Sequence, residues 1–391
     1  MLDFLFSHKR SPIAIDIGAD SIKMLQMHRV GGVVGVCACG RWRFPQSAPS
    51  EPAQRREMIV SAVREMLCNG GFRGRRVATV LRCDELGIKN VRLPHMPEKE
   101  LIEAVRWEAR ERFGFEVGAD QLAYINAGEI RAGGEIRDEI VLLAVSPETL
   151  QGHLDLLDEL KLAPEHVDAE PVALFRTFER FLRRRVDEQA VTVLVDMGLL
   201  ATRVIVARGR QIVFIKSIDI GGKNFNEAVS KRLNLSVEEA RDLRLRSMFE
   251  TSAPAGTPES EPDAAPTDRA ESVSYAIRDA IRSEAEALGR EIGLCLRYCS
   301  VTFRGLRPDR ITLVGGEAYD QAARELLSEN LQMECRLGQP LKNVDVSGAD
   351  LGSDRRGMLS EWAVCTGLAL RYVDVANDTQ EGDHGEHRLS A

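Results

Sequence analysis

The sequence lacks the segments and fingerprints that mark several common classes of protein. No stretch approaches 18 consecutive apolar residues, and the first ten residues contain neither a long apolar region nor a cleavage site, so we expect a cytoplasmic protein. The eight cysteines include no CxxC pair, which favours buried thiols in a reducing compartment over a metal site. No Gly-x4-Gly-Lys-Ser/Thr loop, GxGxxG fingerprint or HExxH site is present, which excludes P-loop, dinucleotide and zincin chemistry.

Charge and size predict a two-lobed protein whose main partner is not nucleic acid. The net charge is −8, and acidic and basic residues are mixed along the chain. Binding to nucleic-acid phosphates needs a concentrated basic face instead. With 391 residues, of which 44% are hydrophobic, the chain is too long for one simple core and can fill two.

The most informative stretch is a strand that ends in an Asp-x-Gly turn and continues as a second strand. Apolar residues run into Asp16, Gly18 allows a tight turn, and apolar alternation resumes after Ser21. Such a turn presents backbone N–H groups to an anion, Asp16 can hold a hydrated Mg²⁺, and Lys23 can reach a phosphate. The segment is a candidate phosphate clamp, and the alternative is a plain hairpin.

The same pattern occurs a second time. Apolar residues run into Asp196, Gly198 follows, and another strand begins at Thr202. Both copies continue through a short turn into a third strand, which indicates an internal duplication. A third glycine site, Gly315-Gly316-Glu317, follows an apolar strand and precedes a helix.

This order of two Asp-x-Gly loops and a later Gly-Gly turn resembles the actin, heat-shock ATPase and sugar-kinase superfamily. The resemblance implies an α/β protein with the actin-like ATPase fold: two lobes, each with a duplicated mixed β-sheet flanked by helices, plus an α/β insert subdomain in the first lobe. It implies that the two loops bind ATP and Mg²⁺ from opposite lobes, with Asp16 and Asp196 holding the metal through water. The implied nucleotide-binding residues are Asp16, Gly18, Ser21 and Lys23 in the first loop and Asp196, Gly198 and Thr202 in the second. The turn at Gly315, Gly316 and Glu317 would lie against the adenosine.

A narrower resemblance rests on residues 93–109. Here Met96-Pro97 precedes a helix with the run Glu103-Ala104-Val105-Arg106-Trp107-Glu108-Ala109. This stretch resembles the type IV pilus assembly family PilM, although Phe113-Gly114-Phe115 stands where the family usually has a proline. The resemblance implies a groove that receives the cytoplasmic N-terminus of a PilN-like bitopic inner-membrane protein, with Met96 and Trp107 as contacts. The alternative is that Trp107 and Arg106 only attach the subdomain to the lobe.

Three further segments acquire roles from the resemblance. Glu170 would lie near the metal and the attacking water, although Glu170-Pro171 is also an ordinary helix start. Gly221 and Gly222 would form another glycine turn that binds the nucleotide. Glu238 and Arg241 would approach the ribose and adenine, although an i,i+3 pair is also typical of a solvated helix face.

The second clamp departs from the family pattern. Leu199-Leu200-Ala201 stands before Thr202, where relatives often carry Ala-Glu-Ser. Because a polar pair beside the phosphates is lost, we expect ATP hydrolysis to be slow or absent while binding is retained.

These assignments predict six segments along the chain. Residues 251–270 contain four prolines, five alanines and no Val, Ile, Leu or aromatic residue, which predicts a disordered loop. The segments are a leader at 1–10, the first lobe at 11–90, the insert subdomain at 91–163, the connecting helix of the first lobe at 164–190, the second lobe at 191–372 with the loop at 251–270, and a disordered tail at 373–391.

The leading hypothesis is an ATP-binding cytoplasmic scaffold of the type IV pilus inner-membrane assembly platform, peripheral to the inner membrane through its partner. Other platform components and further copies of the chain are additional expected partners. The alternatives are a slow ATPase or small-molecule kinase, for which Glu170 is the only candidate catalytic acid, and an FtsA-like cell-division scaffold. FtsA-like chains normally end in a basic amphipathic helix, whereas this tail is polar and acidic.

Overall fold

The computed structural model describes residues 9–45, 51–132, 134–250, 268–303, 305, 307–351, 358–373 and 386–388. Apart from a few residues at their ends, the predicted leader at 1–10, loop at 251–270 and tail at 373–391 lie outside the described residues. No helix in the described ranges is both long enough and apolar enough to cross a membrane.

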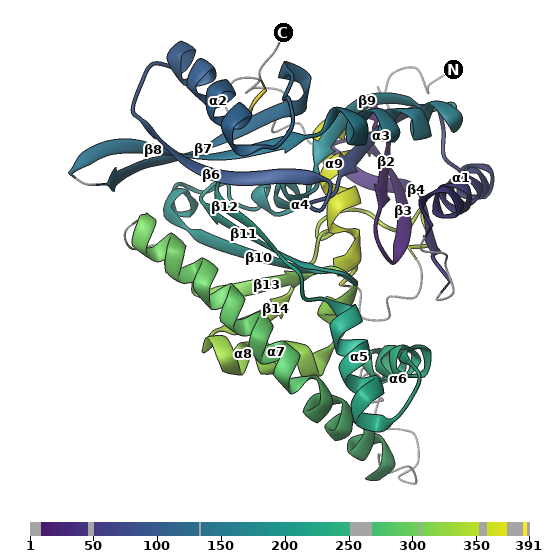
Figure 1. Ribbon diagram of the computed structural model, residues 1–391. Coiled ribbons are helices and arrows are strands. Elements are labelled where there is room, and N and C mark those ends of the chain that lie inside the picture. The colour runs from purple at the N-terminus through teal and green to yellow at the C-terminus, as the bar shows by residue number, and fades with distance from the viewer. Residues whose placement is uncertain are drawn as a thin grey trace.

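The first sheet combines antiparallel and parallel pairing (Figure 1). Its strands run in the order β1-β3-β2-β5-β9, with β4 also paired to β3. Ile13 and Ile15 of β2 pack in the cluster beneath helices α1 and α3, whereas Ala14 belongs to the central core. The elements are β1 (Lys9–Arg10), β2 (Ile13–Ile17), β3 (Ser21–Val30), β4 (Val33–Arg43), α1 (Pro52–Asn69), β5 (Arg76–Leu81), α3 (Pro147–Glu159) and β9 (Ala163–Ala169).

The second sheet repeats this arrangement. Its order β12-β11-β10-β13-β14 matches β4-β3-β2-β5-β9 of the first sheet, with an antiparallel meander followed by parallel strands. The predicted duplication is therefore confirmed by the topology. The elements are β10 (Val191–Met197), β11 (Thr202–Arg208), β12 (Gln211–Ile218), α5 (Gly222–Leu233), α6 (Val237–Glu250), α7 (Asp268–Thr302), β13 (Arg310–Val314), α8 (Gln321–Leu331) and β14 (Glu334–Leu337).

The third sheet has the order β15-β7-β8-β6 and carries helix α2 on one face. Its elements are β6 (Leu86–Pro94), α2 (Glu98–Arg112), β7 (Leu122–Ala132), β8 (Glu135–Val145) and β15 (Glu386–Arg388). This sheet belongs to the predicted insert, but it begins before residue 91, and α3 packs on the first sheet instead. Strand β15 pairs with β7, so these three residues form a strand, contrary to the predicted disordered tail. The remaining domain boundaries stay predictions.

Two helices meet at the centre of the molecule (Figure 1). They are α4 (Glu170–Glu179) and α9 (Ala363–Val373). A Cβ atom at Gly367 would lie 1.7 Å from the carbonyl oxygen of Ala173, so only glycine permits this close approach. The hydroxyl of Thr177 donates to the carbonyl of Ala363 at 2.6 Å. The close approach at Gly367 and the Thr177 hydrogen bond therefore hold α4 against α9.

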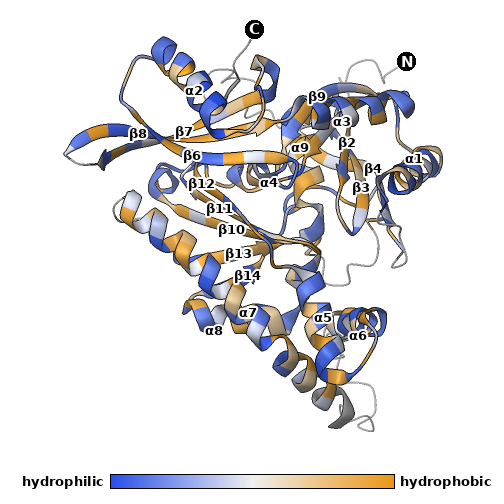
Figure 2. Ribbon diagram, in the orientation of Figure 1, coloured by the Kyte–Doolittle hydropathy of each residue, from blue (hydrophilic) through white to orange (hydrophobic). Residues whose placement is uncertain are grey.

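Hydrophobic residues run along the strands, while the helices alternate between hydrophobic and hydrophilic positions (Figure 2). Helix α7 buries an apolar stripe that includes Ile277, Ile281, Leu288 and Ile292. The eight cysteines are all free thiols. Five are buried, Cys295 and Cys299 among them, whereas Cys68 is exposed and Cys37 and Cys39 are half-buried.

Candidate nucleotide-binding site

The two Asp-x-Gly turns face the same cavity. It has a volume of about 440 Å³ and is lined by the β2–β3 and β10–β11 turns together with residues from α4, α6 and the segments around 315–317 and 360–364. Small-molecule sites typically enclose roughly 300–1,000 Å³. The predicted site residues that line it are Asp16, Gly18, Ser21, Lys23, Glu170, Asp196, Gly198, Arg241, Gly315, Gly316 and Glu317.

The predicted residues Thr202, Gly221, Gly222 and Glu238 do not line the cavity. Thr202 is fully buried and its hydroxyl donates to the carbonyl of Ile220 at 2.7 Å. Glu238 is exposed in the first turn of α6, so only its predicted companion Arg241 reaches the cavity. Gly222 lies outside the cavity lining, and a Cβ atom at this position would be 2.1 Å from Oε1 of Glu317.

In the first turn, Asp16 and Lys23 lie directly opposite each other on β2 and β3. The Nζ atom of Lys23 donates to Oδ2 of Asp16 at 2.9 Å, and both side chains are nearly buried. Burial by itself lowers the pKa of Lys23, but the facing Asp16 carboxylate outweighs this effect and holds the pKa above its usual value. Lys23 therefore stays protonated, and its side chain lines the cavity.

In the second turn, Asp196 lies opposite Arg203 in the same way. A guanidinium nitrogen of Arg203 donates to Oδ2 of Asp196 at 3.4 Å, and its Nε lies 3.2 Å from Oε2 of Glu170. Arg203 was not among the site residues predicted from the sequence. The spacing in the sequence could have identified it, because Lys23 and Arg203 each follow their aspartate by seven positions.

Glu170 is buried at the start of α4 and accepts a hydrogen bond from the backbone N–H of Cys83 at 2.9 Å. Burial raises the pKa of Glu170 to about 7, against the opposing pull of Arg203, and the charges of Asp196 and Asp16 add to the rise. Burial also raises the pKa of Asp196. A buried acid with a pKa near neutral is suited to proton transfer, but its partner here is an arginine.

Other cavity residues were also missed by sequence reasoning. Asp20 forms ion pairs with Arg43, at 3.8 Å, and with Arg241 of α6. Arg41 of β4 pairs with Glu361 at 2.8 Å, although 320 positions separate them. The lining residues Arg82, Asp84 and Asp219 complete this set. Each lysine or arginine that lines the cavity is therefore ion-paired within the protein.

Glu317 is held from behind the cavity by Arg244. The fully buried Arg244 guanidinium donates to Glu317 at 2.8 Å and to Asp320 at 2.6 Å. Burial raises the pKa of Glu317, while Arg244 opposes the rise. The glutamate that follows Gly315 and Gly316 is thus held in place by the buried Arg244.

The two predicted partner contacts differ in exposure. Trp107 is 60% exposed on α2, whereas Leu101, Val105 and Ala109 of the same helix are buried. Met96 is half-buried and packs against the cluster beneath α2.

The paired sheets with a cavity between their turns define the class of actin-like ATPases, as predicted, and this fold is one that binds nucleotides. A family model described as type IV pilus assembly protein PilM matches residues 14–253, and the chain belongs to this family. A model of the cell division protein FtsA also matches residues 193–353.

Comparison with solved structures agrees with this fold. A structure described as a PilM-PilN type IV pilus biogenesis complex is 23% identical, with a TM-score of 0.73 over 93% of this chain and 98% of that chain. The ethanolamine utilization protein EutJ from Carboxydothermus hydrogenoformans is 12% identical, with a TM-score of 0.51 over 92% of this chain and 89% of that chain.

Proposed function

We propose that the cavity binds Mg-ATP and that the chain acts as a nucleotide-responsive scaffold of the type IV pilus inner-membrane platform. The observation that carries the nucleotide assignment is the duplicated pair of an aspartate and a cation facing one cavity. Asp16 and Asp196 supply the oxygen ligands that a hydrated Mg²⁺ prefers. Lys23 and the backbone N–H groups of the two turns suit phosphates.

The remaining roles follow from position. Gly315, Gly316, Glu317 and Arg241 line the part of the cavity that we assign to the adenosine. Bound Mg²⁺ would neutralise phosphate charge. The cavity cations already pair with carboxylates, so a triphosphate must compete for them. We therefore expect its binding to rearrange ion pairs such as Asp20–Arg241 and Arg41–Glu361.

We infer that hydrolysis is slow or absent. A general base must be free to accept a proton from water, and the charge of Arg203 beside Glu170 disfavours this. The pKa of Glu170 near 7 favours the alternative of an ATPase or kinase, and a phosphate-release assay separates the two. Turnover above about 1 s⁻¹, within the ordinary enzyme range, would contradict the scaffold assignment.

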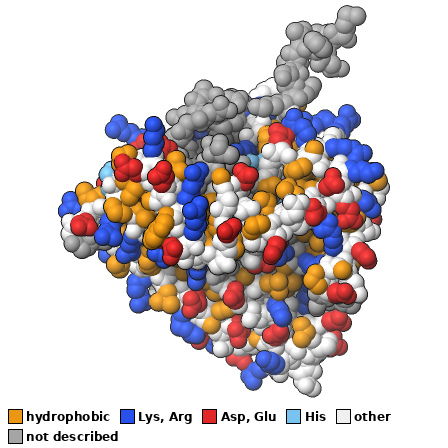
Figure 3. Space-filling model, turned by 45° about the horizontal axis from the view of Figure 1, so that its top comes forward, with side chains coloured by type: hydrophobic (Ala, Val, Ile, Leu, Met, Phe, Trp, Pro, Cys, Tyr) orange, Lys and Arg blue, Asp and Glu red, His pale blue; other side chains and the backbone are white. Residues whose placement is uncertain are grey.

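The proposed partner is the cytoplasmic N-terminal segment of a PilN-like bitopic membrane protein. Family membership and the exposed Trp107 support this choice, and the related PilM protein was solved as a complex with PilN. An exposed tryptophan is a frequent anchor in protein interfaces. Figure 3 shows charged side chains of both signs mixed with apolar ones on one face of the molecule. The chain would then lie at the cytoplasmic side of the inner membrane through its partner.

The test is a pull-down with the full-length protein from a detergent extract of its native membranes, with and without Mg-ATP. We expect a single-span protein with a short cytoplasmic N-terminus to co-purify and Mg-ATP to change its yield. The variant W107A should reduce recovery by at least about tenfold, because an anchor residue contributes roughly 2 kcal/mol.

The matched control is Y275A, which removes an aromatic residue that is 79% exposed on α7. Recovery of the membrane protein by Y275A but not by W107A would support the assigned surface. Equal recovery by both variants would contradict it.

A further inference from the structure

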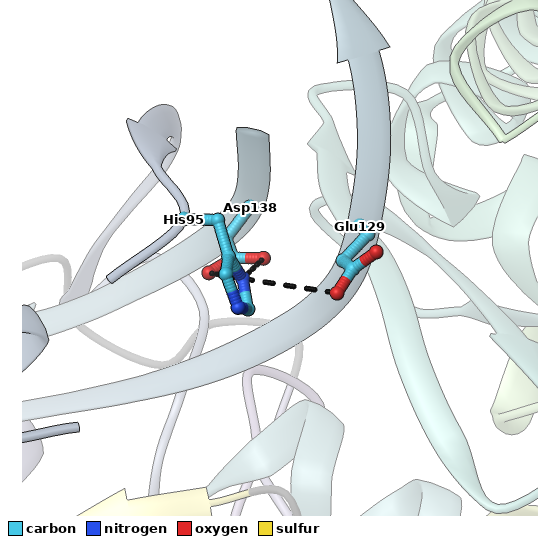
Figure 4. A group of neighbouring side chains, drawn as sticks. All are labelled: His95, Glu129 and Asp138. Atoms are coloured by element: carbon cyan, nitrogen blue, oxygen red, sulfur yellow. Dashed lines mark hydrogen bonds and ion pairs between the residues drawn. The ribbon is translucent and has the colours of Figure 1, made fainter. Parts of the chain in front are cut away.

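A cluster of three potential metal ligands lies on the third sheet, away from the nucleotide cavity. It consists of His95, Glu129 and Asp138, whose ligand atoms all lie within 4.8 Å of one another. Figure 4 shows His95 and Asp138 side by side, with Glu129 reaching toward them from a neighbouring strand. His95 follows the end of β6, Glu129 lies on β7 and Asp138 lies on β8, which is paired with both other strands.

The sheet register explains why the three residues meet. Asp138 of β8 lies opposite Glu129 of β7 on one side and opposite Leu93 of β6 on the other. Residues directly opposite in a sheet project from the same face, as do residues two positions apart on one strand. The register shift between Asn126 and Gly128 brings Glu129, rather than a neighbour, opposite Asp138.

Asp138 is unusual because its carboxylate is buried. Its side chain is 3% exposed, and His95 is its only hydrogen-bond or ion-pair partner among the residues that the structure describes. The next residue, Glu139, projects from the other face and is equally buried, but it has Arg92 at 2.8 Å and the hydroxyl of Tyr298. A buried carboxylate requires a compensating positive charge. Glu139 has one in Arg92, whereas the partner of Asp138 among the described residues is the imidazole of His95, which lies beside the carboxylate of Glu129.

We propose that His95, Glu129 and Asp138 bind a zinc ion. The Nδ1 atom of His95 lies 3.2 Å from Oδ2 of Asp138 and 3.7 Å from Oε1 of Glu129. Ligand atoms on one tetrahedral zinc ion are about 3.3 Å apart, given bonds of about 2.0–2.2 Å. The imidazole selects zinc over Mg²⁺ and Ca²⁺, and three protein ligands leave a position for water.

The ion would join the end of β6 to the β7–β8 hairpin. His95 stands between β6 and α2, immediately before Met96. Zinc binding therefore fixes the segment from which α2 starts. This inference depends on neither the nucleotide nor the pilus partner.

The test is a titration of the full-length protein with zinc in competition with a chelating dye, combined with thermal unfolding. We expect saturable binding and a zinc-dependent rise in the unfolding temperature, since an ion that binds the folded state stabilises it. The variants H95Q and E129Q should each lose at least about tenfold in affinity and most of the temperature rise. Glu129 is 60% exposed, so E129Q should unfold like the wild type without metal. H95Q removes the partner of the buried Asp138, so its zinc-dependent rise is measured against its own metal-free unfolding temperature.

Two controls separate this site from other zinc ligands of the chain. E135Q removes a carboxylate that is 73% exposed on β8, and H387Q removes a histidine of β15. Both should bind zinc like the wild type, and anomalous diffraction at the zinc edge should place the ion among His95, Glu129 and Asp138. Affinity unchanged in H95Q and E129Q, or no saturable binding by the wild type, would overturn the proposal.

Discussion

At the scale of single residues, Arg203 is the cation between two buried carboxylates. Its side chain is 14% exposed, and those of Glu170 and Asp196 are 7% and 10% exposed. In R203M the carboxylates lose this cation, and we expect a loss of about 3 kcal/mol in the free energy of unfolding, as when one partner of a buried pair is removed. Urea unfolding measures the loss.

The same variant should show a specific dependence on pH. The pKa of Glu170 rises from 4.5 to about 7 on folding, so the folded protein binds the extra proton between these values and loses stability as pH rises through that window. Without Arg203 the pKa rises further and the window extends upward. The destabilisation by R203M should therefore be larger at about pH 8 than at about pH 5.

The control is R203K, which keeps the charge. It should retain most of the stability at both pH values. An equal loss in R203K and R203M would show that the shape of the guanidinium, rather than its charge, stabilises this site.

At the scale of elements, the start of α5 packs against Glu317 of the segment η3 (Gly316–Tyr319). A Cβ atom in G222A would lie 2.1 Å from Oε1 of Glu317, which Arg244 holds in place. Displacing Glu317 breaks this pair, so we expect a loss of about 2 kcal/mol, as for other cases of overpacking. Thermal or urea unfolding measures it.

Gly316 offers the matched control, because a Cβ atom there would have no atom within 4 Å. G316A should unfold like the wild type. If the contact with Glu317 is the cause, the effects of G222A and E317A should be non-additive in a double-mutant cycle. Additive effects would exclude that contact as the cause.

At the scale of the whole molecule, the pair of Asp20 and Arg241 joins the turn of the first sheet to α6 beside the second sheet. Both side chains are partly exposed, at 28% and 18%, so the pair contributes about 1 kcal/mol. In D20N we expect the equilibrium to shift about fivefold toward a form in which the first and second sheets stand farther apart across the cavity. Small-angle scattering should show a larger radius of gyration without nucleotide, and Mg-ATP should reduce it.

R43Q tests whether the bridge between the halves is responsible. Arg43 pairs with Asp20 within the first half, at 3.8 Å. R43Q removes this pair and should have the same radius of gyration as the wild type. A radius that is equal in D20N and the wild type would show that this pair does not hold the halves together.

The sequence predicted the parts of the molecule that repeat a local pattern. The two strand–turn–strand units around Asp16-x-Gly18 and Asp196-x-Gly198 could be predicted because the same residue types recur in both. Arg41 and Glu361 were missed because no local pattern marks two residues that meet only after the chain has folded. Thr202 was misplaced because its hydroxyl, although polar, satisfies a nearby backbone carbonyl. The insert was predicted to extend to residue 163, but α3 packs in the cluster of the first sheet, a contact that forms only after folding and that no local pattern marks.

The exposed tryptophan on α2 gives the protein a spectroscopic probe of its own surface. Of three tryptophans, Trp362 is sealed in the interior and Trp42 is half-buried, so soluble quenchers reach mainly the indole of Trp107. A ligand that covers α2 would shield this indole and move its emission to shorter wavelengths. Occupancy of this face can therefore be followed in the unlabelled protein by fluorescence.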